Sequence, residues 1–173
     1  VVPSVSAVSL SEAVTGLSAY GGYIRTRSKL KVAITASGSQ DSTISSYRTS
    51  IDGSSYSLSS FTSNTLKTAG TLKVTVTVTD SRGRTGSHAQ SITVLDYSPP
   101  SLTKFSAERC NSAGTAAQRD GNRVRVSLAG SASSLGSKNT LTCTVYYRIT
   151  SNTAWTQSTT VAASNYAVSA SNL

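Results

Sequence analysis

The chain has 173 residues, of which 35 are serine and 24 are threonine, and 16 basic against 7 acidic residues give it a formal net charge of +9. Only 13% of the residues are charged, against roughly 25% in globular domains, and no apolar run approaches the ~18 residues of a membrane-spanning helix. β-Branched residues carry the apolar pattern and methionine is absent, which argues against a helical protein. Because the apolar residues alternate regularly, the composition predicts a folded all-β protein rather than a disordered one.

Three segments of the first half alternate in the way that antiparallel strands do. Between Lys29 and Ile34 the apolar residues fall on one face, and the same holds between Ser46 and Ile51. Asp52-Gly53 follows at once and predicts a hairpin turn. The segment Leu72–Thr79 places leucine and valine on one face and lysine and threonine on the other, as in a sandwich with one dry and one wet side.

Turn residues divide the chain into two predicted modules. Asp80-Ser81-Arg82-Gly83 ends the Leu72–Thr79 strand, because the aspartate can accept backbone N–H groups and the glycine can take positive φ. A last strand then carries Ile92 and Val94. The two prolines of Tyr97-Ser98-Pro99-Pro100 cannot continue a strand ladder. We therefore expect one module over residues 1–97 and a second over residues 98–173.

The second half repeats the theme in a shorter form. Pro100-Ser101-Leu102 resembles Pro3-Ser4-Val5 at an offset of 97 residues, and Asp120-Gly121 precedes another alternating segment with Val124, Val126 and Leu128. From Leu141 to Ile149 the odd-numbered residues predict a dry face that includes Cys143 and Tyr147. Trp155 is expected to open the next strand and to pack on a second core.

This second module lacks a counterpart to the strands that carry Leu72–Thr79 and Ile92–Val94. Either it is a reduced module or the chain was cut before its final hairpin, and we favour the cut. The chain also begins at Val1 without an initiator methionine, so its start looks like a cut in a longer polypeptide. An incomplete sandwich leaves a sheet edge exposed, and such edges invite pairing with another chain.

The two cysteines, Cys110 and Cys143, lie 33 residues apart without the spacing or the histidines of a zinc site. A disulfide and two buried free thiols are both compatible with the sequence, and we favour the free thiols because unpaired cysteine is commonly buried.

The feature that could carry binding is a row of four basic residues, Arg25, Arg27, Lys29 and Lys31. In an extended strand all four side chains lie on one face, where they could contact the phosphates of nucleic acid or of wall teichoic acid. The alternative, which we favour, is a solvated strand face whose charges protect a sheet edge from aggregation. Tyr20 and Tyr23 lie just upstream, but no further aromatic residue joins the row, so specific recognition of nucleic acid is not expected.

The residue types needed for catalysis or for cofactor binding are scarce. The single histidine, His88, is expected on an exposed strand, and a Ser-His-Asp triad would also need an oriented carboxylate and an oxyanion hole. The seven carboxylates show no metal-ligand spacing, and Asp52, Asp80 and Asp120 occupy predicted turns. We therefore predict no enzyme, no cofactor and no metal.

Several of these motifs together resemble a family. The Tyr-x-x-x-Ile-Asp-Gly hairpin, the strand that runs into Asp80-Ser81-Arg82-Gly83, and the Tyr97-Ser98-Pro99-Pro100 junction are similar to those of tandem immunoglobulin-like modules. Such modules occur in minor structural proteins of the tails of phages and prophages of Gram-positive bacteria. The second half fits the same pattern through the residues and motifs Arg109, Asp120-Gly121, Tyr147-Arg148 and Trp155.

The resemblance implies two tandem immunoglobulin-like antiparallel β-sandwich domains, the second without its final strands. It implies a structural, non-enzymatic spacer or assembly element of a phage tail or tail tip near the host surface. The expected location is the virion, assembled in the bacterial cytoplasm. The expected partners are other tail proteins or identical copies in a homo-oligomer, for example a trimer, with no membrane insertion.

A second hypothesis is a host-surface adhesin module that recognises anionic wall polysaccharide or teichoic acid. In that case the row of Arg25, Arg27, Lys29 and Lys31 is the binding surface. A bacterial surface adhesin unrelated to phage, located on the cell surface, would share the same architecture.

Overall fold

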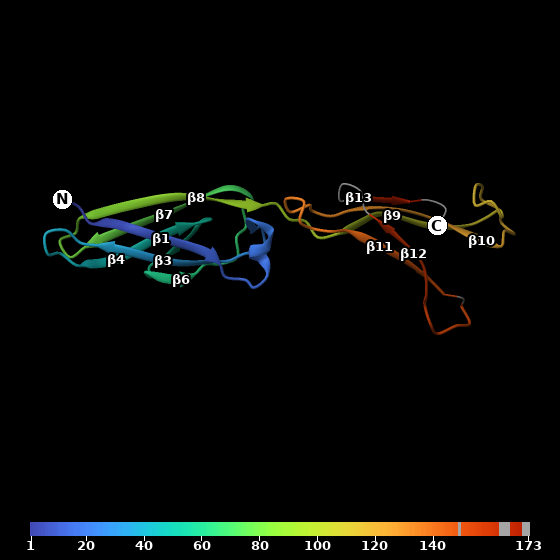
Figure 1. Cartoon of the computed structure of the whole chain (residues 1–173), viewed down its shortest axis with the longest axis horizontal. Coiled ribbons are helices and arrows are strands. Elements are labelled where there is room, and N and C mark those ends of the chain that lie inside the picture. The colour runs from blue at the N-terminus through green and yellow to red at the C-terminus, as the bar shows by residue number, and fades with distance from the viewer. Residues whose placement is uncertain (149, 163–166, 171–173) are drawn as a thin grey trace. The chain divides into compact units, whose positions relative to one another are not determined.

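The structure, a computed structural model, describes residues 1–148, 150–162 and 167–170. Within them the chain forms strands and turns, with one short 3₁₀ helix, η1 (Leu17–Tyr20). The prediction of an all-β protein is therefore confirmed. The chain divides into two compact units, residues 1–97 and residues 98–173, and Figure 1 shows the strands of each.

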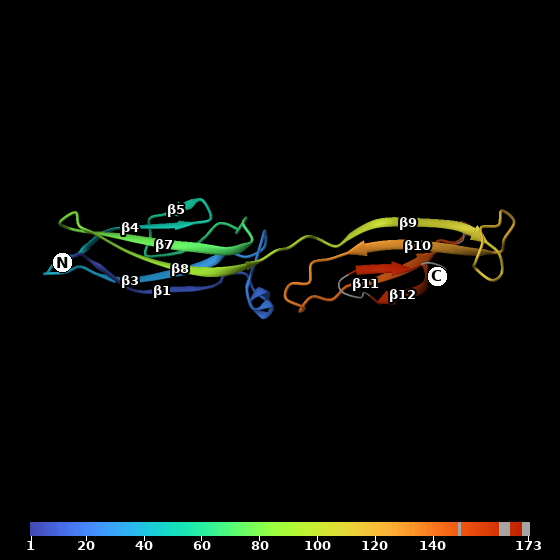
Figure 2. The ribbon, with the colours of Figure 1, turned by 90° about the horizontal axis from the view of Figure 1, so that it is seen from above.

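The first unit contains two β-sheets. One has three antiparallel strands in the order β1 (Ser4–Glu12), β3 (Leu30–Ser37), β6 (Ser60–Thr62). The other has five strands in the order β2 (Tyr23–Ile24), β8 (Thr85–Leu95), β7 (Gly70–Asp80), β4 (Ile44–Ile51), β5 (Ser54–Tyr56). In this second sheet only β2 and β8, among the described strands, run parallel. Figure 2 shows the two sheets as two layers of a β-sandwich.

The core of the first unit lies between these two layers. Both sheets contribute to it from the apolar positions that the alternation predicted, and these residues are Leu30, Val32, Ile34, Val74, Val76 and Val78. Burial of each such side chain stabilises the fold by roughly 1.5–3 kcal/mol. Lysine and threonine occupy the opposite faces of β3 and β7. One dry and one wet face per sheet is the arrangement that the sequence predicted.

The predicted turns are also present. Asp52 and Gly53 connect β4 to β5 with φ angles of 47° and 76°, the positive values that a two-residue hairpin loop requires. Gly83, at φ 77°, closes the turn between β7 and β8 and donates its N–H to the Asp80 carbonyl at 2.9 Å.

The second unit repeats part of this arrangement. A three-stranded antiparallel sheet has the order β13 (Ala167–Ala170), β10 (Arg123–Ser131), β9 (Ser101–Cys110). A separate antiparallel pair consists of β11 (Thr142–Tyr147) and β12 (Thr156–Ala162). Its core contains Leu128 and Val145, with Leu141 and Cys143 packed against them.

Some predictions for the second unit are wrong. Trp155 does not pack on a core: its side chain is 64% exposed, and β12 begins one residue later, at Thr156. The indole ring instead lies against the Arg148 guanidinium, whose Cζ atom is 5.2 Å from the ring centroid. The predicted dry face of β11 ends at Val145, because Tyr147 is exposed, and Ile149 lies outside the described residues.

Both cysteines are free thiols, with Cys110 buried and Cys143 half-buried.

Among the described residues, no helix has the length and hydropathy needed to cross a membrane.

Candidate functional site

The four basic residues of the predicted binding row do not lie on one extended strand, and that part of the prediction is wrong. The chain turns back between Ile24 and Ser28, where the Ser28 N–H donates to the Ile24 carbonyl at 2.9 Å. Thr26 has a φ of 62° and donates its N–H to the Leu66 carbonyl at 2.7 Å. The turn is needed because the chain leaves β2 in the five-stranded sheet and enters β3 in the three-stranded sheet.

Arg25 is held by the segment through which the chain leaves the first unit. Its Nε atom is 2.7 Å from a carboxylate oxygen of Asp96, and its guanidinium donates to the Tyr97 carbonyl at 3.2 Å. The Arg25 backbone N–H donates to the Leu95 carbonyl at 3.0 Å, which extends the parallel pairing of β2 with β8. Arg25 is therefore engaged within its own unit.

Arg27 contacts the same segment in a different way. Its guanidinium carbon lies 5.0 Å from the centroid of the Tyr97 ring, a cation–π contact of the kind that contributes about 0.5–1 kcal/mol at an exposed site. Together Arg25 and Arg27 fix Asp96 and Tyr97, the last two residues of the first unit.

Lys29 and Lys31 are the part of the row that stays exposed to solvent. Lys29 precedes β3, and Lys31 lies on the outer face of β3, opposite Ser11 of β1 and Thr62 of β6. Within the described residues, neither side chain forms a salt bridge to a carboxylate. The row thus consists of two arginines in intramolecular contacts and two free lysines.

In the second unit two basic residues, Arg123 and Arg125, also occupy alternate positions of one strand, and one of them is paired with a carboxylate. Arg125 forms a salt bridge with Glu108 on the neighbouring strand β9, with Nε 2.9 Å from the carboxylate, and donates to the Thr115 carbonyl at 2.9 Å. Arg123 remains exposed at the start of β10.

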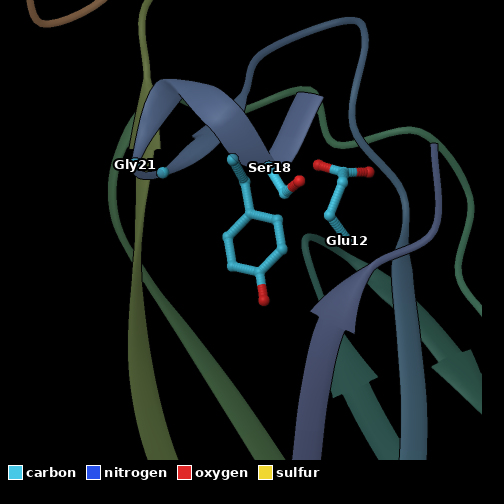
Figure 3. A pocket seen from close by; sticks show the side chains of 5 residues that line it. Glu12, Ser18 and Gly21 are labelled. Atoms are coloured by element: carbon cyan, nitrogen blue, oxygen red, sulfur yellow. The ribbon is translucent and has the colours of Figure 1, made fainter. Parts of the chain in front are cut away.

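A shallow hollow of about 260 Å³ lies near the turn of the basic row. It is lined by Glu12, Ser18, Gly21, Gly22 and Tyr23, from the end of β1, the helix η1 and the start of β2, and Figure 3 shows Glu12 and Ser18 at its wall. Ligand pockets of drug-sized molecules usually measure about 300–1,000 Å³, so this hollow lies below that range.

Of the two carboxylate oxygens of Glu12, one has structural partners, and the other, Oε2, is buried without a hydrogen-bond partner within the described residues. One Glu12 oxygen accepts the N–H groups of Val14 at 2.9 Å and Lys29 at 3.3 Å, so the carboxylate fastens the end of β1 to the start of β3. Burial, together with the negative charge of Glu12, raises the pKa of the Tyr23 phenol above its usual value of 10. A tyrosine with a raised pKa stays neutral and cannot serve as a base at physiological pH.

Among the described residues, no group of three or more histidine, cysteine, aspartate or glutamate side chains could hold a metal ion. His88 lies exposed on β8. The partners of the basic row, Asp96 and Tyr97, were missed by the sequence reasoning because β2 is only two residues long. In the sequence, Asp96 and Tyr97 are far from Arg25 and Arg27. An acidic and an aromatic residue at the end of a strand are common, so this pattern does not predict their contact with the two arginines.

Three solved structures resemble parts of the chain. The PKD1 domain of the metalloprotease PrtV from Vibrio cholerae is 28% identical, over 54% of this chain and 98% of that domain, with a TM-score of 0.41. The PKD1 domain of Vibrio anguillarum Epp is 19% identical, over 54% of this chain and 94% of the domain, with a TM-score of 0.39. A structure of carbohydrate-binding modules from the β-sandwich superfamily is 16% identical, over 73% of this chain and 54% of that one, at 0.39.

These structural scores are too low to assign a function to the chain. None of the curated proteins compared with it matches significantly. A family model described as "Siphovirus protein of unknown function (DUF859)" matches residues 1–172, and the chain therefore belongs to this family of phage proteins.

Proposed function

We propose that the chain is a non-enzymatic structural module of a siphovirus tail or tail tip, where it acts as a spacer or assembly element. The observation that carries this proposal is the use of Arg25 and Arg27. Both residues hold the segment through which the chain leaves the first sandwich. A spacer needs a well-ordered segment where the chain leaves the module, and the two arginines order that segment. In a binding module we would expect the same cations to be exposed to a ligand.

The exit segment is held by three kinds of interaction at once. The parallel pairing of Tyr23-Ile24 with Val94-Leu95 continues the sheet, the Arg25–Asp96 salt bridge holds the next residue, and the Arg27–Tyr97 contact holds the one after it. The Pro99-Pro100 pair that follows has fixed φ angles and restricts the residue before each proline. Conformational freedom is thus reduced on both sides of residue 98.

The outer surface of the five-stranded sheet also suits a structural role. It presents mostly neutral side chains, paired across β7 and β8 as Thr75 with Ala89, Thr77 with Ser87, and Thr79 with Thr85. Two cations, Lys73 of β7 and Arg48 of β4, lie on the same face. Such a surface is hydrated and carries few charges, which suits packing against identical copies or other tail proteins.

The proposal is tested by immunogold electron microscopy of purified siphovirus particles, with an antibody raised against this chain. We expect gold particles on the tail or at its tip. A chain that is abundant in the infected-cell lysate but missing from the purified particles would contradict the proposal. Labelling of the capsid would contradict the tail location.

The alternative function is binding of anionic wall polysaccharide or teichoic acid at the host surface. Lys29 and Lys31 favour it, because both side chains are exposed and form no salt bridge within the described residues. Polyphosphate polymers bind such free cations by releasing counterions.

Co-sedimentation with purified Gram-positive cell walls at low salt separates the two functions. The alternative predicts that Lys29→Ser with Lys31→Ser abolishes binding without lowering the melting temperature. The matched control removes the same charge elsewhere, by Arg48→Ser with Arg82→Ser, two exposed positions on β4 and in the β7–β8 turn. Equal weak binding by both variants would instead indicate a non-specific effect of net charge.

A further inference from the structure

A second hollow lies at the end of the β9–β10 hairpin, within the second unit. It measures about 360 Å³, which falls inside the usual range of ligand pockets, about 300–1,000 Å³. Figure 2 shows the connection between the two strands, residues 111–122, beyond the ends of β9 and β10. The lining residues come from the last turn of this connection and from the adjoining strand ends: Arg109, Asp120, Gly121, Asn122, Arg123 and Val124.

Hydrogen bonds hold the connection against the end of β9. The Asn111 N–H donates to the Ala116 carbonyl, and the Gln118 N–H donates to the Arg109 carbonyl, both at 3.0 Å. The Gly121 N–H then donates to the Gln118 carbonyl at 3.0 Å and closes the turn that lines the hollow. The backbone around the hollow is therefore held in place by the chain itself.

Close packing also fixes the two sides of the connection. A Cβ atom at Gly121 would lie 2.0 Å from the Cys110 carbonyl oxygen, so only glycine allows the turn to lie this close to β9. On the other side, Arg125 donates to the Thr115 carbonyl at 2.9 Å and forms its salt bridge with Glu108. The hollow thus belongs to a closely packed hairpin end.

The cations that line the hollow have no partner in the chain. Within the described residues, neither Arg109 nor Arg123 forms a salt bridge or a side-chain hydrogen bond. They differ in this from Arg125 of the same hairpin, which is paired with Glu108. A guanidinium presents five N–H donors in one plane and pairs well with the two oxygens of an anion. The hollow therefore offers unused donors to an anionic group.

The other lining groups restrict the kind of anion that fits. The exposed Asp120 carboxylate accepts hydrogen bonds only, so the ligand must also bring a donor. The Asn122 amide both donates and accepts, as a peptide backbone does. The Val124 side chain is 54% exposed and offers an apolar contact. A ligand that satisfies all of these groups combines an anionic group, N–H donors and an apolar part.

We propose that this hollow binds an acidic peptide segment of another virion protein. A side-chain carboxylate of the segment accepts N–H groups of Arg109 and Arg123. The backbone of the segment forms hydrogen bonds with Asp120 and Asn122, and an apolar side chain beside the carboxylate covers Val124. The inference rests on the proposed function, because it names the kind of partner that an assembly element holds.

A phosphate polymer such as teichoic acid fits the hollow less well. Its repeated anionic groups would lie beside the Asp120 carboxylate, where like charges repel each other, and it brings no apolar side chain to Val124. Basic residues outnumber acidic ones in residues 98–173, so the second unit attracts acidic partners of any kind from a distance. The groups of the hollow then favour a peptide among these partners.

The first test is a titration followed by nuclear magnetic resonance. A blocked hexapeptide of alternating glutamate and leucine is added to the isotope-labelled chain, and the backbone amide shifts are recorded. We expect saturable shifts at Arg109 and at residues 120–124, and none there with a hexapeptide in which glutamine replaces glutamate. Arg109→Ser with Arg123→Ser should weaken binding at least about tenfold, because two charge-assisted pairings are lost.

The matched control is Arg48→Ser with Arg82→Ser, which removes the same charge from exposed positions of the first unit. It should change the affinity by less than about twofold, since exposed charges this remote are largely screened by salt. The melting temperature of both double variants should equal that of the unchanged chain. Equal weakening by both variants would overturn the proposal, and so would the absence of shifts around the hollow.

A second probe distinguishes a peptide from a phosphate polymer. Inorganic polyphosphate is titrated into the unchanged chain and into Val124→Ser. The proposal predicts that Val124→Ser weakens the glutamate–leucine peptide about threefold, through loss of an apolar contact, and leaves polyphosphate binding unchanged. Polyphosphate that binds the hollow more tightly than the peptide would overturn the proposal. Immunogold labelling tests the tail location separately, so a tail protein without peptide binding would refute this site alone.

Discussion

At the scale of single residues, Asp80 shows how one buried carboxylate connects several backbone and side-chain groups at the turn between β7 and β8. Its carboxylate is buried at the end of β7. One oxygen accepts the N–H groups of Arg82 at 3.0 Å and Arg84 at 2.9 Å. The other accepts the Ser42 hydroxyl at 3.0 Å and the Arg84 Nε–H at 2.9 Å. Burial alone would raise the pKa of Asp80, but these hydrogen bonds lower it to about 2.

This lowered pKa makes stability depend on pH in a defined window. Because the folded pKa lies below the value of 3.8 for an unperturbed aspartate, ionised Asp80 stabilises the fold above about pH 4, and this contribution is lost as the pH falls towards 2. We expect Asp80→Asn to lower the melting temperature at pH 7 and to flatten its decline between pH 4 and 2. Melting curves followed by circular dichroism across this range check the prediction.

The matched control for this experiment is Asp41→Asn, which changes an exposed carboxylate in the loop before β4. Asparagine tolerates the positive φ of this position as aspartate does. An Asp41 variant that reproduced the loss seen for Asp80→Asn would show that general charge, and not the buried carboxylate, is responsible.

Arg25 provides a second prediction at this scale. Its salt bridge to Asp96 is partly exposed, with side-chain exposures of 35% and 69%, so we expect Arg25→Ser to cost only about 1 kcal/mol, including the lost hydrogen bond to Tyr97. Local opening of the exit segment should then make chymotrypsin cleavage after Tyr97 about five times faster. Arg48→Ser removes the same charge from an exposed position on β4 and should leave the rate unchanged.

The sequence predicted the turn role of Asp80 but not its partners. An Asp-x-x-Gly turn is visible locally, whereas Ser42 is 38 residues distant and meets Asp80 only because β4 pairs with β7. The contacts of Arg25 with residues 96 and 97 are hidden for the same reason. Alternation along a segment predicts which way side chains point only if the backbone is extended, and the turn at Thr26 breaks that condition.

At the scale of elements, the first apolar residue of β3 and the first apolar residue of β10 should respond differently to substitution by alanine. Leu30→Ala creates a cavity in a closed core and should destabilise the first unit by about 2–5 kcal/mol. Val124→Ala removes an exposed side chain and should change the stability of the second unit by less than about 0.5 kcal/mol. Amide hydrogen exchange measured at increasing urea concentrations gives the free energy of unfolding of each unit separately. Equal losses would contradict the difference in burial between Leu30 and Val124.

Strands with strict alternation and a strong turn signal were the most predictable elements. The segment Leu72–Thr79 and the Asp52-Gly53 hairpin lie where the pattern placed them. Trp155 was predicted to be buried from its size alone, but burial needs an opposing layer. Within the described residues of the second unit, Trp155 directly precedes β12 of a two-stranded pair, and at this margin its side chain stays exposed. The sequence around Trp155 does not show whether another segment of the chain packs over the indole ring.

At the scale of the whole molecule, the resemblance to phage tail modules predicted a phage protein, and the family match over residues 1–172 confirms this. Immunoglobulin-like modules, a tail location, a Gram-positive host and a homo-oligomer stay predictions. The net charge of +9 was the main reason to consider an anionic ligand. Three of the basic residues, Arg25, Arg84 and Arg125, form salt bridges with carboxylates of the chain. These pairs leave the net charge unchanged, but they occupy three arginines that could otherwise contact a ligand.

The central claim is that this chain holds other parts of the virion in place and does not bind the host wall. The measurement that tests it most directly is co-sedimentation of the chain with purified Gram-positive cell walls, titrated with salt. The account predicts either no binding or weak binding that disappears with modest salt, as expected for a diffuse positive charge. Saturable binding that survives at about 0.3 M salt, well beyond simple screening of phosphates, would contradict it and identify an adhesin.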